Sequence, residues 1–222
     1  MRTLLIAVPV VAVLAIAAGF AFFALSGDDA PPPPSLAANT TPAASSTTAE
    51  PSDDGTLRVA PGGDSFVGYR VGEEFIGVGV KQAVGRTSDV TGTVTVEGAE
   101  ITAAELKADM TTLQSDEGRR DNALRGRGIQ TDQFPEATFT LGEPVKLSRT
   151  AQTATGALTL HGVTKTVEVK VSGQKTSGGG VEIAGTTDIA FADFDIEPPS
   201  IAGFVTVEDR GALEFQLIAG QG

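Results

Sequence analysis

Only a few side chains in this 222-residue sequence have the types and spacing that chemistry requires. His161 is the only histidine, and the sequence has no cysteine. A zinc site needs several grouped Cys, His or carboxylate ligands, so His161 cannot build one alone. Its place before Gly162 favours a structural role in a turn. We therefore predict neither a metal site nor any other cofactor.

Two pairs of carboxylates are candidates for acid–base work. Glu73 and Glu74 are adjacent, and adjacent residues of a strand point to opposite faces, so these two would not share a site. Asp193 and Asp195 fall where a strand runs into a loop, which favours surface charge. No serine or threonine stands in a recognisable His–Asp context that would activate it. We expect no enzymatic activity.

One dense basic cluster remains, made of Arg119, Arg120, Arg125 and Arg127. A guanidinium group suits phosphate and carboxylate oxygens, so Arg119, Arg120 and Arg125 are candidates for binding a lipid head group. The alternative is a solvated helix face on which Arg119 or Arg120 holds a neighbouring aspartate or loop carbonyl. A helix is predicted from Asp116 to Arg125, capped by Ser115 or Asp116 and stopped by Gly126 or Gly128.

The N-terminal 25 residues indicate where the protein works. Residues 4–25 form an uncharged apolar run, long enough to cross a bilayer. Arg2 precedes the run, and Asp28 and Asp29 follow it, which places the rest of the chain outside the cytoplasm. We predict an uncleaved membrane anchor over 1–25; the alternative is a cleaved signal peptide, which would release a secreted protein. The net charge of −12 argues against a nucleic-acid partner.

A different composition follows over residues 26–55, which are rich in Pro, Ala, Ser and Thr, with four consecutive prolines at 31–34. Such a segment has too few apolar side chains to offset the entropy of ordering, so it is predicted to be a disordered linker with a stiff proline spacer. Residues 56–222 are then left to form one globular domain.

This domain has the period of β-strands. Apolar residues alternate with polar ones, most clearly over 167–171, and alternation favours antiparallel strands with one covered face. Turns are predicted at 97–98, 161–162, 177–180 and 209–211. About eight strands and one short helix give an all-β fold, either a sandwich or a closed barrel, and the pattern does not choose between them.

Four segments in order resemble the YceI-like family of extracytoplasmic lipid-binding domains. They are Tyr69–Gly92, the Arg119–Arg125 helix with its Arg-Asp-x-x-Leu pattern, the Thr131–Phe139 strand entry, and Gly156–Lys165 with its G-x-L-T-L-x-G-V-T pattern. The resemblance covers most of 57–219. It implies an extended lipocalin-like antiparallel β-barrel whose lumen holds a long apolar chain, a polyisoprenoid or fatty-acyl lipid.

The same resemblance implies that the alternating apolar residues face the lumen. The lumen candidates are Val94, Val96, Leu106, Met110, Phe139, Leu141, Leu158, Leu160, Val167, Val169, Ile189, Phe191, Val205, Val207 and Phe215. The predicted function is non-catalytic sequestration or transport of such a lipid by a membrane-tethered barrel. The rivals are a domain whose core is simply filled, serving structure or protein interaction, and an enzyme acting on envelope lipids. Sequence does not fix the oligomeric state.

Overall fold

The computed structural model describes residues 30–37, 55–199 and 205–221. Its strands and helices follow one another in the order β1 (Gly55–Val59), β2 (Phe66–Phe75), β3 (Gly79–Thr87), β4 (Val90–Glu97), β5 (Glu100–Asp109), η1 (Met110–Thr112), β6 (Gln114–Ser115), α2 (Gly118–Gly126), β7 (Glu136–Leu141), β8 (Val145–Lys146), β9 (Gln152–Leu160), β10 (Val163–Lys175), β11 (Val181–Ala190), η2 (Phe191–Phe194), β12 (Val205–Val207) and β13 (Arg210–Gly220).

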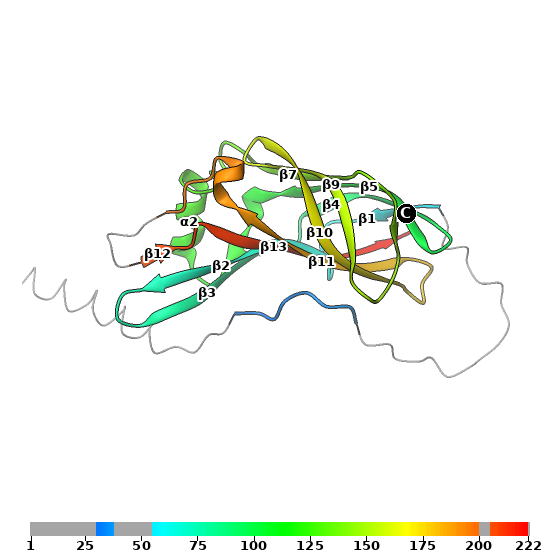
Figure 1. The fold of residues 1–222 in the computed structure, drawn as a ribbon, viewed down its shortest axis with the longest axis horizontal. Helices are drawn as coiled ribbons and strands as arrows, with labels where there is room; N and C mark the ends of the chain where they lie inside the picture. The colour runs from blue at the N-terminus through cyan, green and yellow to red at the C-terminus, as the bar shows by residue number, and fades with distance from the viewer. Residues whose placement is uncertain (1–29, 38–54, 200–204, 222) are drawn as a thin grey trace, which may run out of the picture.

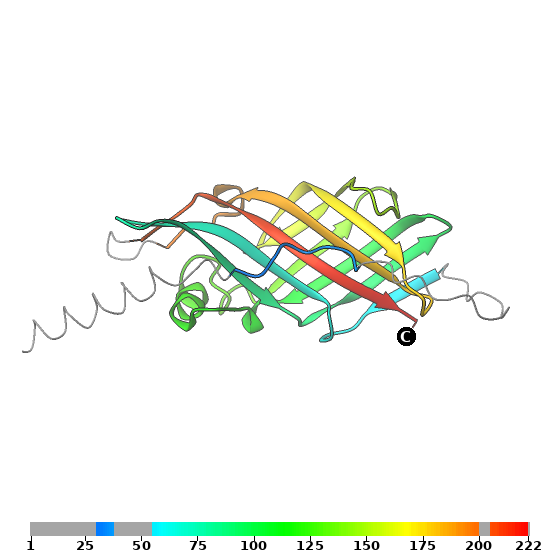
Figure 2. The same cartoon turned by 90° about the horizontal axis from the view of Figure 1, so that it is seen from below.

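The strands form a closed antiparallel barrel (Figures 1 and 2). Eight strands make the wall, in the order β1-β4-β5-β7-β9-β10-β11-β13, and β13 returns to β1 through the pairs Arg58↔Gly220 and Val59↔Ala219. The all-β fold class and the lipocalin-like barrel are confirmed, and the sandwich is excluded. A closed wall has no free edge strand along the barrel.

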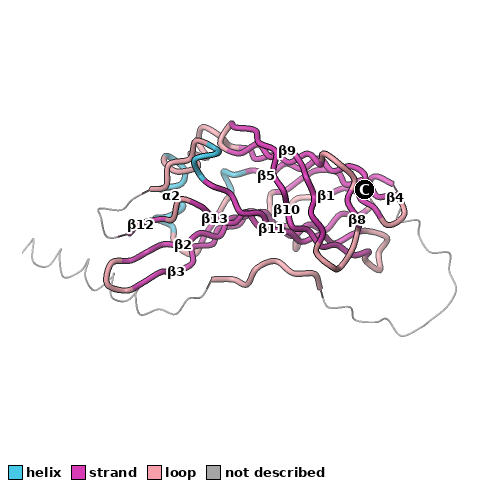
Figure 3. Tube along the Cα trace, viewed as in Figure 1, coloured by secondary structure: helices cyan, strands magenta, loops and turns pink. Residues whose placement is uncertain are grey.

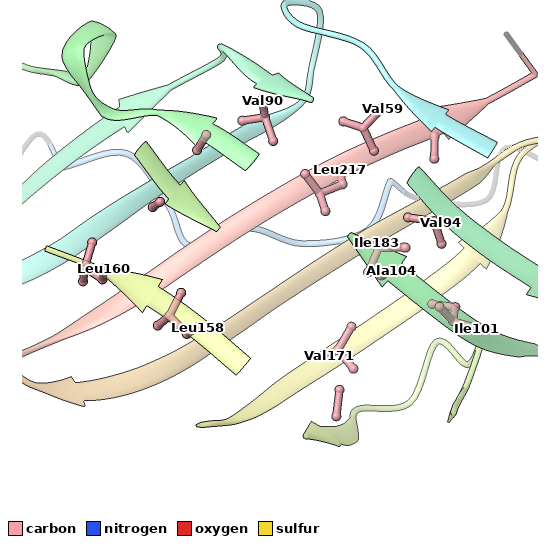
Figure 4. Close-up of a cluster of buried hydrophobic side chains, with 14 of the residues drawn as sticks. Val59, Val90, Val94, Ile101, Ala104, Leu158, Leu160, Val171, Ile183 and Leu217 are labelled. Carbon is pink, nitrogen blue, oxygen red and sulfur yellow. The ribbon is translucent and has the colours of Figure 1, made fainter. Parts of the chain in front are cut away.

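Alternation along the strands builds the core. On β4, Val90, Val94 and Val96 are fully buried while Thr91, Thr93 and Thr95 are half-buried on the opposite face. Figure 4 shows such side chains reaching from several strands into one interior, among them Val94, Ile101, Leu158, Ile183 and Leu217. Burial of these apolar surfaces, at roughly 25 cal/mol per Å², is the main force that closes the barrel.

An extension continues beyond one end of the barrel (Figure 3). Past the pairs with β1, strand β13 pairs with β2 over 212–216, β2 pairs with β3, and the two form a long hairpin. Strand β6 pairs with β3, and helix α2 packs beside it. The helix begins at Gly118 with Glu117 as its cap, two residues later than predicted, because the Glu117 carboxylate accepts the Arg119 amide.

Three of the predicted turns are found between paired strands. Gly98 and Gly162 have φ of 62° and 75°, which L-residues adopt reluctantly, and His161 shares this conformation at 51°. The turn predicted at 209–211 is wrong. Strands β12 and β13 both pair with β2, so the chain only bends there and continues along the same neighbour. The bend explains why a turn-like sequence carries no reversal.

Residues 31–37 lie along the outer face of the barrel, and we call them the strap (Figure 2). Near its start, Arg70 and Arg86 donate to the carbonyl oxygens of Pro31 and Pro32 at 2.6 and 2.8 Å. Near its end, the Ala37 amide donates to Glu182 at 3.0 Å. This part of the predicted linker is therefore bound to the domain, with the stiff prolines limiting the entropy that binding costs.

The strap covers a stripe of charged and polar side chains. Glu214 is 2% exposed and accepts from Arg70 at 3.2 Å and from Arg86 at 2.8 Å. Glu182 accepts from Gln174 at 2.6 Å and from Gln216 at 3.2 Å. Buried carboxylates are tolerated only when paired in this way.

Among the described residues, no helix is both long and apolar enough to cross a membrane. The predicted anchor at 4–25 lies outside the described ranges, so it stays a prediction. The same holds for most of the linker at 26–55.

Leu217 and Ile218 offer a direct test of the inward and outward faces. Leu217 is 1% exposed and Ile218 is 37% exposed on the same strand. Leu217→Ala should lower the free energy of unfolding by about 2–5 kcal/mol through lost transfer energy and a cavity. Ile218→Ala, measured in the same urea titration, should cost well under half as much. Equal losses would contradict the assignment of faces.

Candidate functional site: an apolar barrel lumen

The inner face of the barrel encloses an apolar cavity of about 90 Å³. This is well below the roughly 300–1,000 Å³ of typical small-molecule sites. The wall residues that surround it come from nearly every barrel strand and include Val94, Ala104, Leu158 and Leu217. Side chains must therefore move apart before a long ligand is accommodated.

The predicted lumen residues divide into two groups. Eight of the fifteen line the cavity, and each lies on an inward-facing position of a barrel strand: Val94, Leu106, Phe139, Leu141, Leu158, Val167, Val169 and Phe215.

The other seven lie elsewhere. Val96, Met110, Leu160 and Ile189 are buried in the core but do not line the cavity. Phe191 is not on a strand, because β11 ends at Ala190 and a 3-10 helix begins. Val205 and Val207 belong to β12, which pairs with the far part of β2 beyond the barrel wall. Alternation alone cannot distinguish a strand of the wall from a strand of the extension.

Further cavity-lining residues were missing from the predicted set, and many are small: Val67, Val90, Ile101, Ala104, Ala108, Ala137, Val145, Ala154, Val171, Ile183, Thr187, Leu213 and Leu217. Alanines carry little weight in a hydrophobic pattern, although they keep an interior open. Their signal is positional: each alanine of the set lies two positions from a large inward residue on its strand, as Ala137 does from Phe139, or four positions in the case of Ala154 and Leu158.

Aromatic rings in the lumen lie against glycines of the neighbouring strand. Phe215 lies over Gly185, its paired residue, and Phe139 lies over Gly156 on β9. A Cβ atom at either glycine would overlap the ring. The rings can thus lie along the wall instead of filling the centre of the barrel. Glycines often mark such close approaches in curved sheets, so their positions in the strands could have indicated this packing.

The lining of the cavity includes few polar residues, namely Lys107, Thr138 and Thr187. Thr187, one of its few polar neighbours, donates its hydroxyl to the carbonyl oxygen of Glu168 at 2.7 Å. Lys107 also borders the cavity, but its ammonium group bonds to the exposed Glu136 at 2.6 Å. What remains is an apolar surface suited to hydrocarbon.

A second hollow, of about 510 Å³, lies beside the lumen where β10 and β11 separate. These strands pair only from Lys170↔Thr186 onward, and Val167, Val169 and Thr187 line both the hollow and the cavity. The Thr187–Glu168 hydrogen bond spans the gap. The lumen and this hollow therefore share part of their lining.

The arginine cluster lies on and after α2, away from the cavity. Arg120 is bound to Glu73 through two bonds of 3.0 and 2.9 Å and to Asp116 at 2.6 Å. Arg119 and Arg125 are exposed. None of the three lines the cavity, so head-group binding stays a prediction for them, while the alternative prediction that Arg120 holds a neighbouring aspartate is confirmed.

Helix α2 is fixed to the hairpin through this buried ion pair. Glu73 and Arg120 are 11% and 12% exposed, and Glu74 points out to solvent, as expected of adjacent strand residues. Burial alone would lower the pKa of Arg120, but the bonds to Glu73 raise it on balance. Burial also raises the pKa of the neighbouring Tyr69 above its ordinary value, with Arg120 opposing the shift, so Tyr69 stays neutral.

His161 has the structural role predicted for it. It occupies the turn between β9 and β10, is 8% exposed, and its Nδ1 donates to the carbonyl oxygen of Phe194 at 3.0 Å. Its ring centroid lies 4.2 Å from that of Phe134. The hydrogen bond to Phe194 joins η2 to this turn. Among the described residues, no cluster of three metal-ligating side chains is found.

Comparison with known proteins identifies this arrangement. The family model described as the YceI-like domain matches residues 40–219. The chain belongs to the YceI-like family. A UPF0312 protein of Photorhabdus laumondii is 31% identical over 168 residues, covering 69% of this chain and 84% of that protein. A UPF0312 protein of Vibrio parahaemolyticus is 38% identical, but the match spans only 56% of its length.

Solved structures share the fold of this YceI-like domain. The polyisoprenoid-binding domain from Saccharophagus degradans, implicated in plant cell wall breakdown, superposes with a TM-score of 0.56 at 16% identity, covering 76% of this chain and 99% of that one. Burkholderia cenocepacia BcnA gives 0.55 at 18% identity, covering 69% and 96%. At these identities the comparison shows the fold alone.

The Glu73–Arg120 pair predicts a stability difference between neighbouring arginines. Arg120→Ala leaves the Glu73 carboxylate buried without its partner and should cost about 3 kcal/mol or more in free energy of unfolding. Arg119→Ala removes an exposed side chain and should cost about 0.5 kcal/mol or less. Adding Glu73→Gln to Arg120→Ala should recover part of the loss. Chemical denaturation measures all three, and an equal effect of the two alanine variants would contradict a structural role for Arg120.

Proposed function

We propose that this YceI-like domain binds a long apolar lipid, of polyisoprenoid or fatty-acyl type, in its lumen without chemical conversion. The observation that carries the proposal is the almost entirely apolar lining of a closed barrel, in which the polar groups of Thr187 and Lys107 bond elsewhere. The polyisoprenoid-binding domain from Saccharophagus degradans shares the fold, which supports the same class of ligand.

The driving force is the transfer of hydrocarbon out of water. Each buried methylene contributes roughly 0.8 kcal/mol, so ten carbons contribute about 8 kcal/mol before the costs of ordering. Association itself costs about 4–15 kcal/mol. Short chains should therefore bind weakly and long chains tightly. This agrees with a narrow lumen whose lining side chains must move apart along the length of the ligand.

We further propose that the domain works outside the cytoplasm, tethered to a membrane by residues 4–25. The uncharged run and the charges on either side of it support this location. A lipid carrier at a membrane surface has its cargo close by. We place the entrance at the hollow between β10 and β11, because Val167, Val169 and Thr187 line both this hollow and the lumen.

One observation favours a second function. The cavity measures only about 90 Å³, so the interior is almost filled by side chains. A filled-core domain for structure or protein interaction would have such an interior, and it would gain nothing from lipid. The two candidate functions predict different effects on lipid binding and on melting temperature when a larger side chain fills the remaining cavity.

Ala103 and Ala104 give a matched pair for this test. Ala104 is buried and lines the cavity, whereas Ala103 is exposed on the same strand. Ala104→Leu should fill the lumen and weaken binding of parinaric acid, a fluorescent fatty acid, by about tenfold or more, since overpacking costs roughly 1–3 kcal/mol. Ala103→Leu should bind as the natural protein does, and competition with a polyprenyl phosphate should show the same contrast.

The binding titration is run on the full-length protein, with thermal melting as the check on folding. Equal binding by both variants would show that the probe lies outside the lumen. No binding of either probe by the natural protein, with Ala104→Leu melting at a lower temperature because it overpacks a filled core, would support the filled-core domain instead.

A further inference from the structure

An apolar patch stands at the tip of the β2–β3 hairpin. The exposed fractions of Ile76, Val78 and Val80 are 66%, 41% and 59%. Only one other large hydrophobic residue is exposed to this degree in the described part of the chain, Ile218 at 37%. Ile76, Val78 and Val80 thus fall within five positions of the sequence, and we call these three residues the apolar tip.

The turn itself does not require apolar side chains. The Val78 amide donates to the Phe75 carbonyl oxygen at 3.0 Å, and the unusual backbone angles are taken by Gly77 and Gly79, with φ of 80° and 115°. Polar residues at 76, 78 and 80 would allow the same turn and remain hydrated. Exposed aliphatic side chains grouped at a protruding end mark a surface that meets an apolar partner.

The direction of the strap indicates what that partner is. The strap starts beside the hairpin, where Pro31 and Pro32 are bound by Arg70 of β2 and Arg86 of β3. It ends toward the opposite end of the barrel, where Ala37 is bound by Gln174 and Glu182. The chain that precedes Ala30 therefore leaves from the hairpin side, and Leu25, the last residue of the predicted membrane segment, lies at most about 18 Å of extended chain away.

Exposed basic residues lie at the same end. Arg119, Arg125 and Arg127 are exposed on and just after α2, which the Arg120–Glu73 pair fixes to the hairpin, and two views place α2 at the hairpin end of the molecule (Figures 1 and 2). Arginines near a surface favour anionic lipid. The acidic residues Glu74, Asp116, Glu208 and Asp209 are exposed at this end too, so the apolar tip carries the contact and the arginines only add to it.

We propose that the apolar tip inserts into the interface of the lipid bilayer in which the N-terminal segment is anchored. The strap holds the barrel with its hairpin end toward the membrane and the β10–β11 turn away from it. The partner of the apolar tip is thus a bilayer surface that contains anionic lipid. This inference rests on the proposed location of the domain and is independent of what the lumen binds.

The absence of cysteine from the sequence allows single labels to report depth. Full-length Val78→Cys and Ser177→Cys proteins, labelled with an environment-sensitive fluorophore, are reconstituted into phosphatidylcholine–phosphatidylglycerol vesicles with lipids spin-labelled near the head group. Ser177 is exposed in the β10–β11 turn at the opposite end. Insertion of the tip by ~5–10 Å should quench the Val78 label by roughly half and leave the Ser177 label unquenched.

Serine at the other two tip positions provides the second variant. Ile76→Ser with Val80→Ser, in the Val78→Cys protein, should reduce the quenching at the tip without changing the melting temperature, because both side chains are exposed. A tip label that is no more quenched than the Ser177 label would overturn the proposal and point to a protein partner. A protein that fails to float with the vesicles would contradict the proposed anchorage and the tip contact together, while parinaric acid binding to the lumen is tested separately.

Discussion

Pairing between β1 and β13 turns a sheet into a barrel, and the apolar lumen depends on it. Only two residue pairs make this seam, Arg58↔Gly220 and Val59↔Ala219. Beyond them β13 leaves β1 and pairs with β2. One long strand thus closes the wall at one end and supports the hairpin at the other. An open sheet would expose the inner face to water and lose the main driving force for folding.

The inner face of the barrel wall is apolar, whereas the outer face carries buried charged residues. Inside, alanines and glycine-backed aromatic rings leave a thin apolar passage without a buried polar group that needs a partner. Outside, Glu214 and Glu182 are buried beneath the strap and bonded by Arg70, Arg86 and Gln174. Charge is thereby kept on the outer face, where carbonyl oxygens of the strap also accept hydrogen bonds from Arg70 and Arg86, and the lumen stays suited to hydrocarbon.

The elements that depend on a local pattern could be predicted from the sequence. The strands at 93–96, 137–141 and 167–171 were predictable because each alternates strictly, and the turn at His161–Gly162 because its residues favour φ above zero. The β2–β3 hairpin was not, since its inward face mixes Tyr69 and Glu73 with apolar residues and depends on Arg120 from a distant helix. The bend near Asp209 and the place of β12 depend on pairing with β2, which no local pattern encodes.

Native mass spectrometry of the full-length protein, purified from its own source and followed by organic extraction, tests the central claim most directly. We predict a discrete mass excess that extracts as one class of long-chain lipid, and a smaller fraction of lipid-loaded protein when Ala104 is replaced by leucine. A bare polypeptide mass, unchanged after incubation with fatty acids and polyprenyl phosphates, would contradict it and leave a barrel whose core is simply filled.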